Sequence, residues 1–206
     1  VYTVPSDMVA VGNGTLRNVI TNDNKSTYEW FVSNPINNYN ISVQIGNYVA
    51  VQDTFIKDNT IHNMNHYVLD YNKELALNYF TQSKEVIRFY EKYFGDYQWY
   101  EDGYKLIEVP YLGMEHQSAV TYGNGFSMYN GVRSKSWPMY GVIDPLIIHE
   151  TGHEWFGNSV TASDPTHIWL HEGLQVYSEA IFFEDKFDSY EVGVHYLNTL
   201  KNRIIN

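Results

Sequence analysis

The amino-acid sequence predicts an α+β protein, with an antiparallel sheet in the first third of the chain and mainly helices after it. From Ile41 to Ile45, apolar and polar residues alternate, which is the period of a strand with one buried face. Between Ala76 and Phe94, apolar residues recur every three or four positions, which is the period of an amphipathic helix. This change of period predicts a domain boundary near residue 70.

Short apolar runs separated by turn residues indicate several strands before this boundary. Glycine, asparagine and proline are concentrated at 12–14 and at 34–38, where they favour turns. Short strands joined by tight turns are typical of an antiparallel sheet. The expected strands are Val9–Val11, Tyr28–Val32, Ile41–Ile45 and Tyr48–Val51.

Helix signals dominate the part of the chain after the boundary. A first helix is expected from about Tyr71 to Gly95, which would act as its C-terminal cap. A strand is expected at 105–109, followed by a loop-rich stretch with several glycines. Helices therefore return only in the last third of the chain.

Two helices are expected in this last third. Asp144 followed by Pro145 is a strong helix start, because aspartate caps the free amides and proline is preorganised for the first helical position. We expect this helix to run to about Phe156, and a second one to span about Trp169 to Asp185.

The composition excludes several classes of function. The net charge is −11, from 24 acidic and 13 basic residues, which argues against a nucleic-acid partner. No run of apolar residues is long enough to span a membrane. The chain contains no cysteine, so any metal would be bound by histidine and carboxylate side chains. It begins at Val1 without an initiator methionine or a signal segment, so we expect an internal piece of a longer protein and assign no compartment.

The residues with the clearest chemical meaning are His149, Glu150 and His153, which lie within the expected helix from Asp144. Positions i and i+4 of a helix differ by about 40° and one turn, so the two imidazoles project from one face and can share one ion. Glu150 lies on the neighbouring flank, where its carboxylate can reach a metal-bound water without being a ligand. This pattern is typical of metal-assisted hydrolysis.

A third ligand is expected from the next helix. Catalytic zinc sites use three protein ligands and leave the fourth position to water. Glu172 lies near the start of the helix from Trp169 and can supply the missing carboxylate. Glu179 lies on the same helical face as Glu172 and is either a hydrogen-bond partner of a ligand histidine or a solvated residue.

The segment HETGHEWFGNSVT, residues 149–161, together with 169–173, resembles the aminopeptidase N family of gluzincin zinc metallopeptidases. That family carries a Gly-x-Met-Glu-Asn segment before the zinc helix. Gly113, Met114 and Glu115 match it at a similar spacing, whereas Leu112 and His116 depart from it.

This resemblance implies a fold, an activity and a set of partners. Residues 1–70 would be the C-terminal part of a sandwich-like N-terminal β domain, and residues 71–206 the N-terminal part of a thermolysin-like catalytic domain. The activity would be that of a metallo-aminopeptidase with one Zn²⁺ per chain, in which Gly113, Met114 and Glu115 bind peptides with a free N-terminus. The remaining parts of the full-length enzyme, including an oxyanion-stabilising tyrosine beyond Asn206, would complete the site.

Two alternatives remain open at this point. A thermolysin-like endopeptidase would also cut N-acetylated peptides, and Glu115 argues against it because its carboxylate suits a free ammonium group. A noncatalytic, zinc-bound peptide-binding module would not need Glu150. These residues leave open an epoxide-hydrolysing side activity, which one branch of the family has, and the preference for the first side chain of the substrate.

Overall fold

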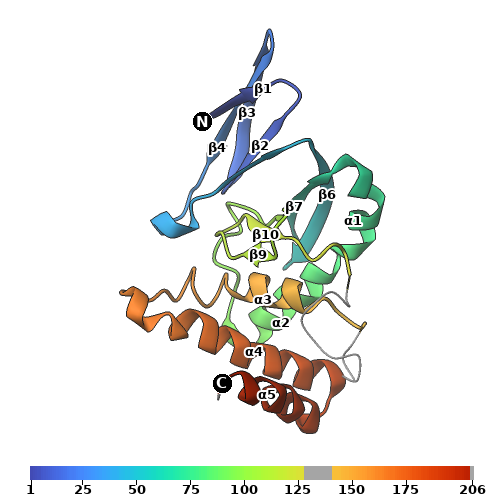
Figure 1. Ribbon diagram of the computed structural model, residues 1–206, viewed down its shortest axis with the longest axis vertical. Coiled ribbons are helices and arrows are strands. Elements are labelled where there is room, and N and C mark those ends of the chain that lie inside the picture. The colour runs from blue at the N-terminus through green and yellow to red at the C-terminus, as the bar shows by residue number, and fades with distance from the viewer. Residues whose placement is uncertain (128–140, 205–206) are drawn as a thin grey trace.

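The computed structural model describes residues 1–127 and 141–204, and it shows an α+β fold (Figure 1). The N-terminal strands lie at one end of the molecule and the helices at the other, with a mixed sheet between them (Figure 1). The prediction of an α+β fold is therefore confirmed. None of the described helices is both long enough and apolar enough to cross a bilayer.

Strands β1 to β5 form two small antiparallel sheets, in the orders β1-β4-β3 and β2-β5. A short 3-10 turn, η1 (Asn38–Asn40), connects β4 to β5. The bounds are β1 (Tyr2–Pro5), β2 (Val9–Gly12), β3 (Thr15–Asn22), β4 (Lys25–Phe31) and β5 (Val43–Gly46).

A second unit of five strands follows, in the order β6-β7-β8-β10-β9. Its first two strands form a hairpin with a turn at Asp58 and Asn59, whose φ values of 48° and 63° match a type I′ turn. β7 and β10 each pair in parallel with β8, whereas β9 pairs antiparallel with β10. The bounds are β6 (Tyr48–Lys57), β7 (Thr60–Leu69), β8 (Leu106–Glu108), β9 (Gly113–Met114) and β10 (Val120–Tyr122).

The five-stranded sheet joins residues from both sides of the boundary predicted near residue 70. Tyr67 on β7 pairs with Ile107 on β8, so the hairpin 48–69 shares a sheet with the later strands. A single alternation pattern cannot reveal this pairing, because it indicates a buried face and not a partner strand. The division into domains at residue 70 stays a prediction.

Most of the helices lie below this sheet, and the first one, α1, lies beside β6 (Figure 1). The expected helix 71–95 is divided into α1 (Lys73–Tyr79) and α2 (Gln82–Phe94), after a 3-10 turn η2 (Asp70–Asn72). The break lies at Phe80 and Thr81, where the Thr81 hydroxyl donates to the Asn78 carbonyl at 2.6 Å. Gly95 follows α2 with φ of 93°, as expected for a C-terminal cap.

The two helices expected in the last third begin where the sequence predicts them, whereas the helix that follows them was not predicted. Asp144 accepts a hydrogen bond from the amide of Leu146 at 2.8 Å and caps the helix that starts at Pro145. This helix ends at Gly152, earlier than the expected Phe156. The bounds are α3 (Pro145–Gly152), η3 (Pro165–His167), α4 (Trp169–Phe187) and α5 (Tyr190–Ile204).

Gly152 allows α3 to pack closely against its neighbours. A Cβ at this position would lie 2.1 Å from the hydroxyl oxygen of Tyr90 on α2 and 2.3 Å from Oε1 of Gln175 on α4. Tyr90, Ile147 and Phe182 are fully buried around this contact. The core between α2, α3 and α4 therefore fixes how closely the helix carrying the two histidines approaches the helix carrying Glu172.

Candidate metal centre

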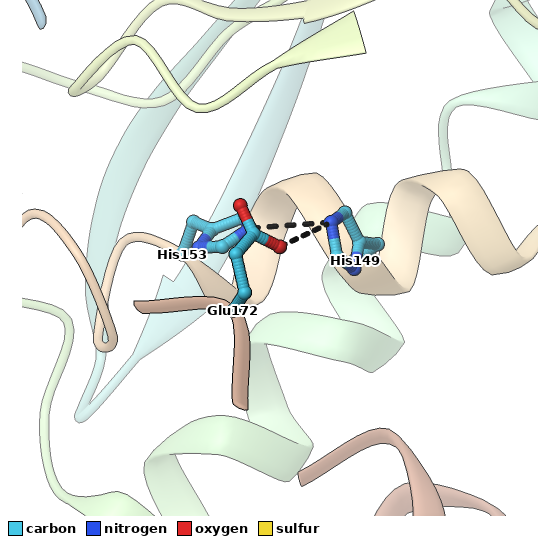
Figure 2. Close-up of side chains that lie close together, drawn as sticks. All are labelled: His149, His153 and Glu172. Atoms are coloured by element: carbon cyan, nitrogen blue, oxygen red, sulfur yellow. Dashed lines mark hydrogen bonds and ion pairs between the residues drawn. The ribbon is translucent and has the colours of Figure 1, made fainter. Parts of the chain in front are cut away.

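Helices α3 and α4 bring His149, His153 and Glu172 together at one place (Figure 2). The two Nε2 atoms are 3.2 Å apart. Oε2 of Glu172 lies 3.5 Å from Nε2 of His149 and 3.7 Å from Nε2 of His153. His153 is buried, whereas the Glu172 side chain is half exposed, so the group opens on one side.

These separations suit a tetrahedral zinc ion. Ligand atoms about 2.0–2.2 Å from such an ion lie about 3.3–3.6 Å from one another. The three observed separations fall close to this range, and two nitrogens with one carboxylate oxygen are a common donor set of catalytic zinc. The residues present therefore fit the metal that the sequence predicts.

The outer ring nitrogens of both histidines are already engaged. Nδ1 of His149 contacts Oε1 of Glu179 at 2.6 Å, and Nδ1 of His153 contacts the carbonyl of Phe156 at 2.8 Å. Both partners are acceptors, so each Nδ1 carries the hydrogen and each Nε2 presents a lone pair to the other in the neutral rings. A cation between the two Nε2 atoms removes this repulsion.

A proton can also bridge these two nitrogens, and it would compete with a metal ion. Burial lowers the pKa of His149, but the hydrogen bond to Glu179 and the surrounding carboxylates outweigh it and raise the pKa to about 9. Metal ligands must be deprotonated, so binding a metal here releases that proton.

Glu150 and Glu115 form the inner wall of the site. Carboxylate oxygens of both residues lie within 4.8 Å of a ring nitrogen of His153 and of each other, and both residues are buried. Burial raises the pKa of Glu150 to about 8, as do the charges of Glu115, Glu172 and Glu179, although His149 opposes the change. Two adjacent buried carboxylates favour a cation or a shared proton between them.

Gly113 and Met114 form the short strand β9, which lies at the edge of the five-stranded sheet beside α3. Among the described strands, β9 pairs only with β10, so its other edge of backbone groups faces no described strand next to the metal-binding residues. A Cβ at Gly113 would lie 2.5 Å from Oε1 of Glu150, so any larger residue there would displace the Glu150 side chain.

The described structure thus brings together the three predicted metal ligands, Glu150 and Glu115, with Gly113 beside Glu150. Met114 follows Gly113 on β9. Glu179, for which the sequence left two roles open, contacts the His149 ring. Sequence reasoning did not find the main-chain carbonyl of Phe156 as the partner of His153, nor Asn158, whose side chain donates to the carbonyl of Glu115 at 3.0 Å. No side-chain pattern encodes a main-chain carbonyl contact.

Residues 78–205 match a family model described as the peptidase family M1 domain, and this match covers more than half of the chain. The chain belongs to peptidase family M1. This confirms the predicted resemblance, because the matched relatives of the family are aminopeptidases and zinc metallopeptidases.

Relatives of known sequence are aminopeptidases of much greater length. Aminopeptidase M1-D of Oryza sativa subsp. japonica is 22% identical over 199 residues, which are 95% of this chain and 22% of that protein. Endoplasmic reticulum aminopeptidase 2 of Homo sapiens is 31% identical over 123 residues, which are 56% of this chain and 12% of that protein. The chain thus spans less than a quarter of these M1 relatives.

A solved structure has the same fold. The M1 zinc metallopeptidase from Deinococcus radiodurans superimposes with a TM-score of 0.77 at 18% identity, over 98% of this chain and 42% of that chain. Both the N-terminal strands and the helices of this chain therefore have counterparts in an M1 peptidase.

Proposed function

We propose that this chain is the zinc-binding part of a metallo-aminopeptidase that removes the N-terminal residue of peptides. The observation that carries the proposal is the convergence of Nε2 of His149, Nε2 of His153 and Oε2 of Glu172, with the carboxylates of Glu150 and Glu115 beside them. Family membership and the aminopeptidase names of the relatives support the same activity.

His149, His153 and Glu172 would hold one Zn²⁺, and its site would remain open on the side where Glu172 is half exposed. Bound zinc would polarise the scissile carbonyl and lower the pKa of a water molecule from about 15.7 towards 7. Glu179 and the Phe156 carbonyl hold the two imidazoles so that each Nε2 faces the ion.

Glu150 is the proposed general base. Its carboxylate is buried next to the ligand histidines without being part of the ligand triangle, so it can accept a proton from the attacking water. It then returns that proton to the nitrogen of the leaving peptide.

Glu115 is the proposed partner of the substrate amine. An α-ammonium group between Glu115 and the zinc-binding residues would form a charge-assisted hydrogen bond and would offset the repulsion between the Glu115 and Glu150 carboxylates. This contact would favour peptides with a free N-terminus over acetylated ones.

Backbone groups of Gly113 and Met114 are proposed to align the peptide. Because β9 is an edge strand beside the metal-binding residues, a substrate can add to it through main-chain hydrogen bonds. Such contacts do not depend on the substrate side chains. Residues that select the first side chain, and the oxyanion-stabilising tyrosine, are proposed to lie in the parts of the full-length enzyme outside this chain.

The experiment compares free and N-acetylated forms of the same peptides, using the full-length protein purified without added metal. We expect stoichiometric Zn²⁺ by elemental analysis, release of N-terminal residues from free peptides only, and loss of activity after chelation that zinc restores. Glu150→Gln should keep the metal and lose at least about 100-fold in kcat.

Other outcomes separate the alternatives. Cleavage of acetylated and free peptides at equal rates would favour an endopeptidase. Zinc and peptide binding with no cleavage in the wild-type protein would favour a noncatalytic module. Absence of zinc from protein that is folded would contradict the proposal.

A further inference from the structure

Three buried asparagines connect the N-terminal strands to the proposed amine-binding residue. The side chain of Asn13, after β2, donates to the carbonyl of Asn40 at 3.0 Å. The side chain of Asn40, in η1, donates to Oδ1 of Asn158 at 2.6 Å. The side chain of Asn158 then donates to the carbonyl of Glu115 at 3.0 Å. All three asparagines are 5% exposed or less, so water does not compete for these bonds.

The last member of this chain of bonds has a fixed orientation. Nδ2 of Asn158 has two hydrogens, and it donates to the carbonyl of Glu115 and to Oε2 of Glu154 at 3.2 Å. Its Oδ1 accepts from Asn40. Without the Asn40 donor, the Asn158 amide loses the hydrogen bond to its oxygen and keeps only those made by its nitrogen.

Glu115 depends on this contact more than a residue inside a strand would. β9 ends at Met114, so Glu115 is the first residue after the edge strand and belongs to no helix or strand. Its carbonyl is attached to the same Cα as the side chain that faces Glu150. Holding the carbonyl therefore fixes the position of the Cα from which the carboxylate side chain extends.

The bonding of Asn40 favours positioning over stability as its main role. Its Oδ1 is buried and has no hydrogen-bond partner among the described residues, although its Nδ2 is well bonded. An unsatisfied buried acceptor costs about 1–3 kcal/mol, which offsets what the donor contributes. The donor function towards Asn158 is thus what the asparagine adds at this position.

We propose that Asn40 and Asn158 are positioning residues for Glu115, so that the η1 turn of the N-terminal part takes part in recognising the substrate amine. This inference rests on the proposed aminopeptidase function. A second contact from the same turn supports it: the Tyr39 ring stacks on the ring of His171, the residue before Glu172, with centroids 6.0 Å apart. The η1 turn therefore contacts the amine-binding side and the metal-binding side of the site.

The test measures kcat and KM for aminoacyl p-nitroanilides with the full-length protein. Asn40→Ala should raise KM about tenfold, because the loss of one oriented buried hydrogen bond is worth about a factor of ten in binding. Zinc content should not change, and kcat should fall by less than about threefold. Asn40→Asp keeps the volume of the side chain but cannot donate, so it should act in the same direction and serves if the alanine variant is unstable. Asn38→Ala, an exposed position in the same turn, is the matched control.

A double-variant cycle separates positioning from general structure. If Asn40 acts through Glu115, Asn40→Ala should change KM by less than about twofold when Glu115→Gln is already present. Equal effects in both backgrounds, an unchanged KM in the single variants, or parallel loss of zinc and kcat would overturn the inference. Failure of both Asn40 variants to fold would likewise show a structural role.

These measurements distinguish a failure of the proposed aminopeptidase function from a failure of the positioning role of Asn40 and Asn158. A wild-type protein that does not prefer free over acetylated substrates contradicts the proposed function, and the inference with it. A wild-type protein that has this preference, and keeps it in both Asn40 variants, contradicts the inference alone.

Discussion

A side chain at Gly113 would collide with Glu150, although the two residues lie 37 positions apart and belong to a strand and a helix. A Cβ at Gly113 would lie 2.5 Å from Oε1, 2.9 Å from Cδ and 3.0 Å from Cγ of Glu150. The end of the Glu150 side chain therefore occupies the space that a side chain at position 113 would need. This contact ties the proposed general base to the proposed peptide-binding edge.

Gly113→Ala is expected to impair catalysis without removing the metal. The added methyl would displace Glu150, and displacement of a buried general base should lower kcat about 10- to 100-fold. Steady-state kinetics and elemental analysis on the same preparations check this. Gly173→Ala is a control in α4, since a Cβ there meets nothing closer than 3.9 Å. Normal kcat in Gly113→Ala would contradict the placement of Glu150.

Glu179→Gln is expected to weaken metal binding. The carboxylate of Glu179 holds the His149 ring through Nδ1, and loss of such a partner typically costs about 10- to 100-fold in metal affinity. Competition with a chelator of known affinity measures the change. An unchanged zinc affinity would show that the His149 ring is held by packing alone.

Glu115→Gln is expected to reduce the preference for free N-termini. The variant keeps the shape of the side chain but not its charge, so KM for free-amine substrates should rise about tenfold or more. Zinc content should stay the same. Comparison of kcat/KM for matched free and acetylated peptides checks this, and a preference equal to that of the wild type would exclude Glu115 as the amine partner.

His66 is expected to make the fold sensitive to acid. Its Nδ1 accepts a hydrogen bond from the amide of Leu106 at 2.9 Å, and burial lowers its pKa from 6.5 to about 4. Between pH 4 and 6.5, His66 therefore binds a proton more readily in the unfolded chain than in the folded one. The free energy of unfolding should therefore keep the full contribution of neutral His66 above pH 6.5. It should fall by about 3 kcal/mol as the pH decreases to 4.

Urea unfolding at pH 7 and at pH 4 measures this contribution. His66→Asn is the matched variant, because its Oδ1 can accept from the Leu106 amide and does not titrate. The wild type should lose about 3 kcal/mol more than the variant between the two pH values. Equal losses would place the acid-sensitive group elsewhere.

The sequence predicted the site residues more completely than the sheet that supports them. His149, Glu150 and His153 are predictable because a helix fixes the directions of residues four positions apart, and Asp144 with Pro145 marks the start of that helix. The pairing of β7 with β8 was not predictable, since their paired residues lie 40 positions apart and an alternation pattern does not name a partner.

The contacts that orient the site were the least predictable. The carbonyl of Phe156 meets His153 only because the chain turns after Gly152, earlier than the helical period indicated. Asn40 and Asn158 carry no local pattern, because buried asparagines act through partners that the fold supplies. Such residues are recognised from hydrogen-bond geometry and not from spacing.

The close packing at Gly152 makes metal affinity a measure of core packing. Gln175, which lies next to Gly152, is one helical turn after Glu172 on α4. On the α3 side, the ligand histidines His149 and His153 stand on either side of Gly152 in the sequence. A larger residue at position 152 would collide with Tyr90 on α2 and Gln175 on α4, and repacking of α4 would carry the Glu172 carboxylate away from the two imidazoles. The metal would then be lost although every ligand remained in the sequence, so zinc content reports on the spacing of two helices as well as on the presence of three side chains.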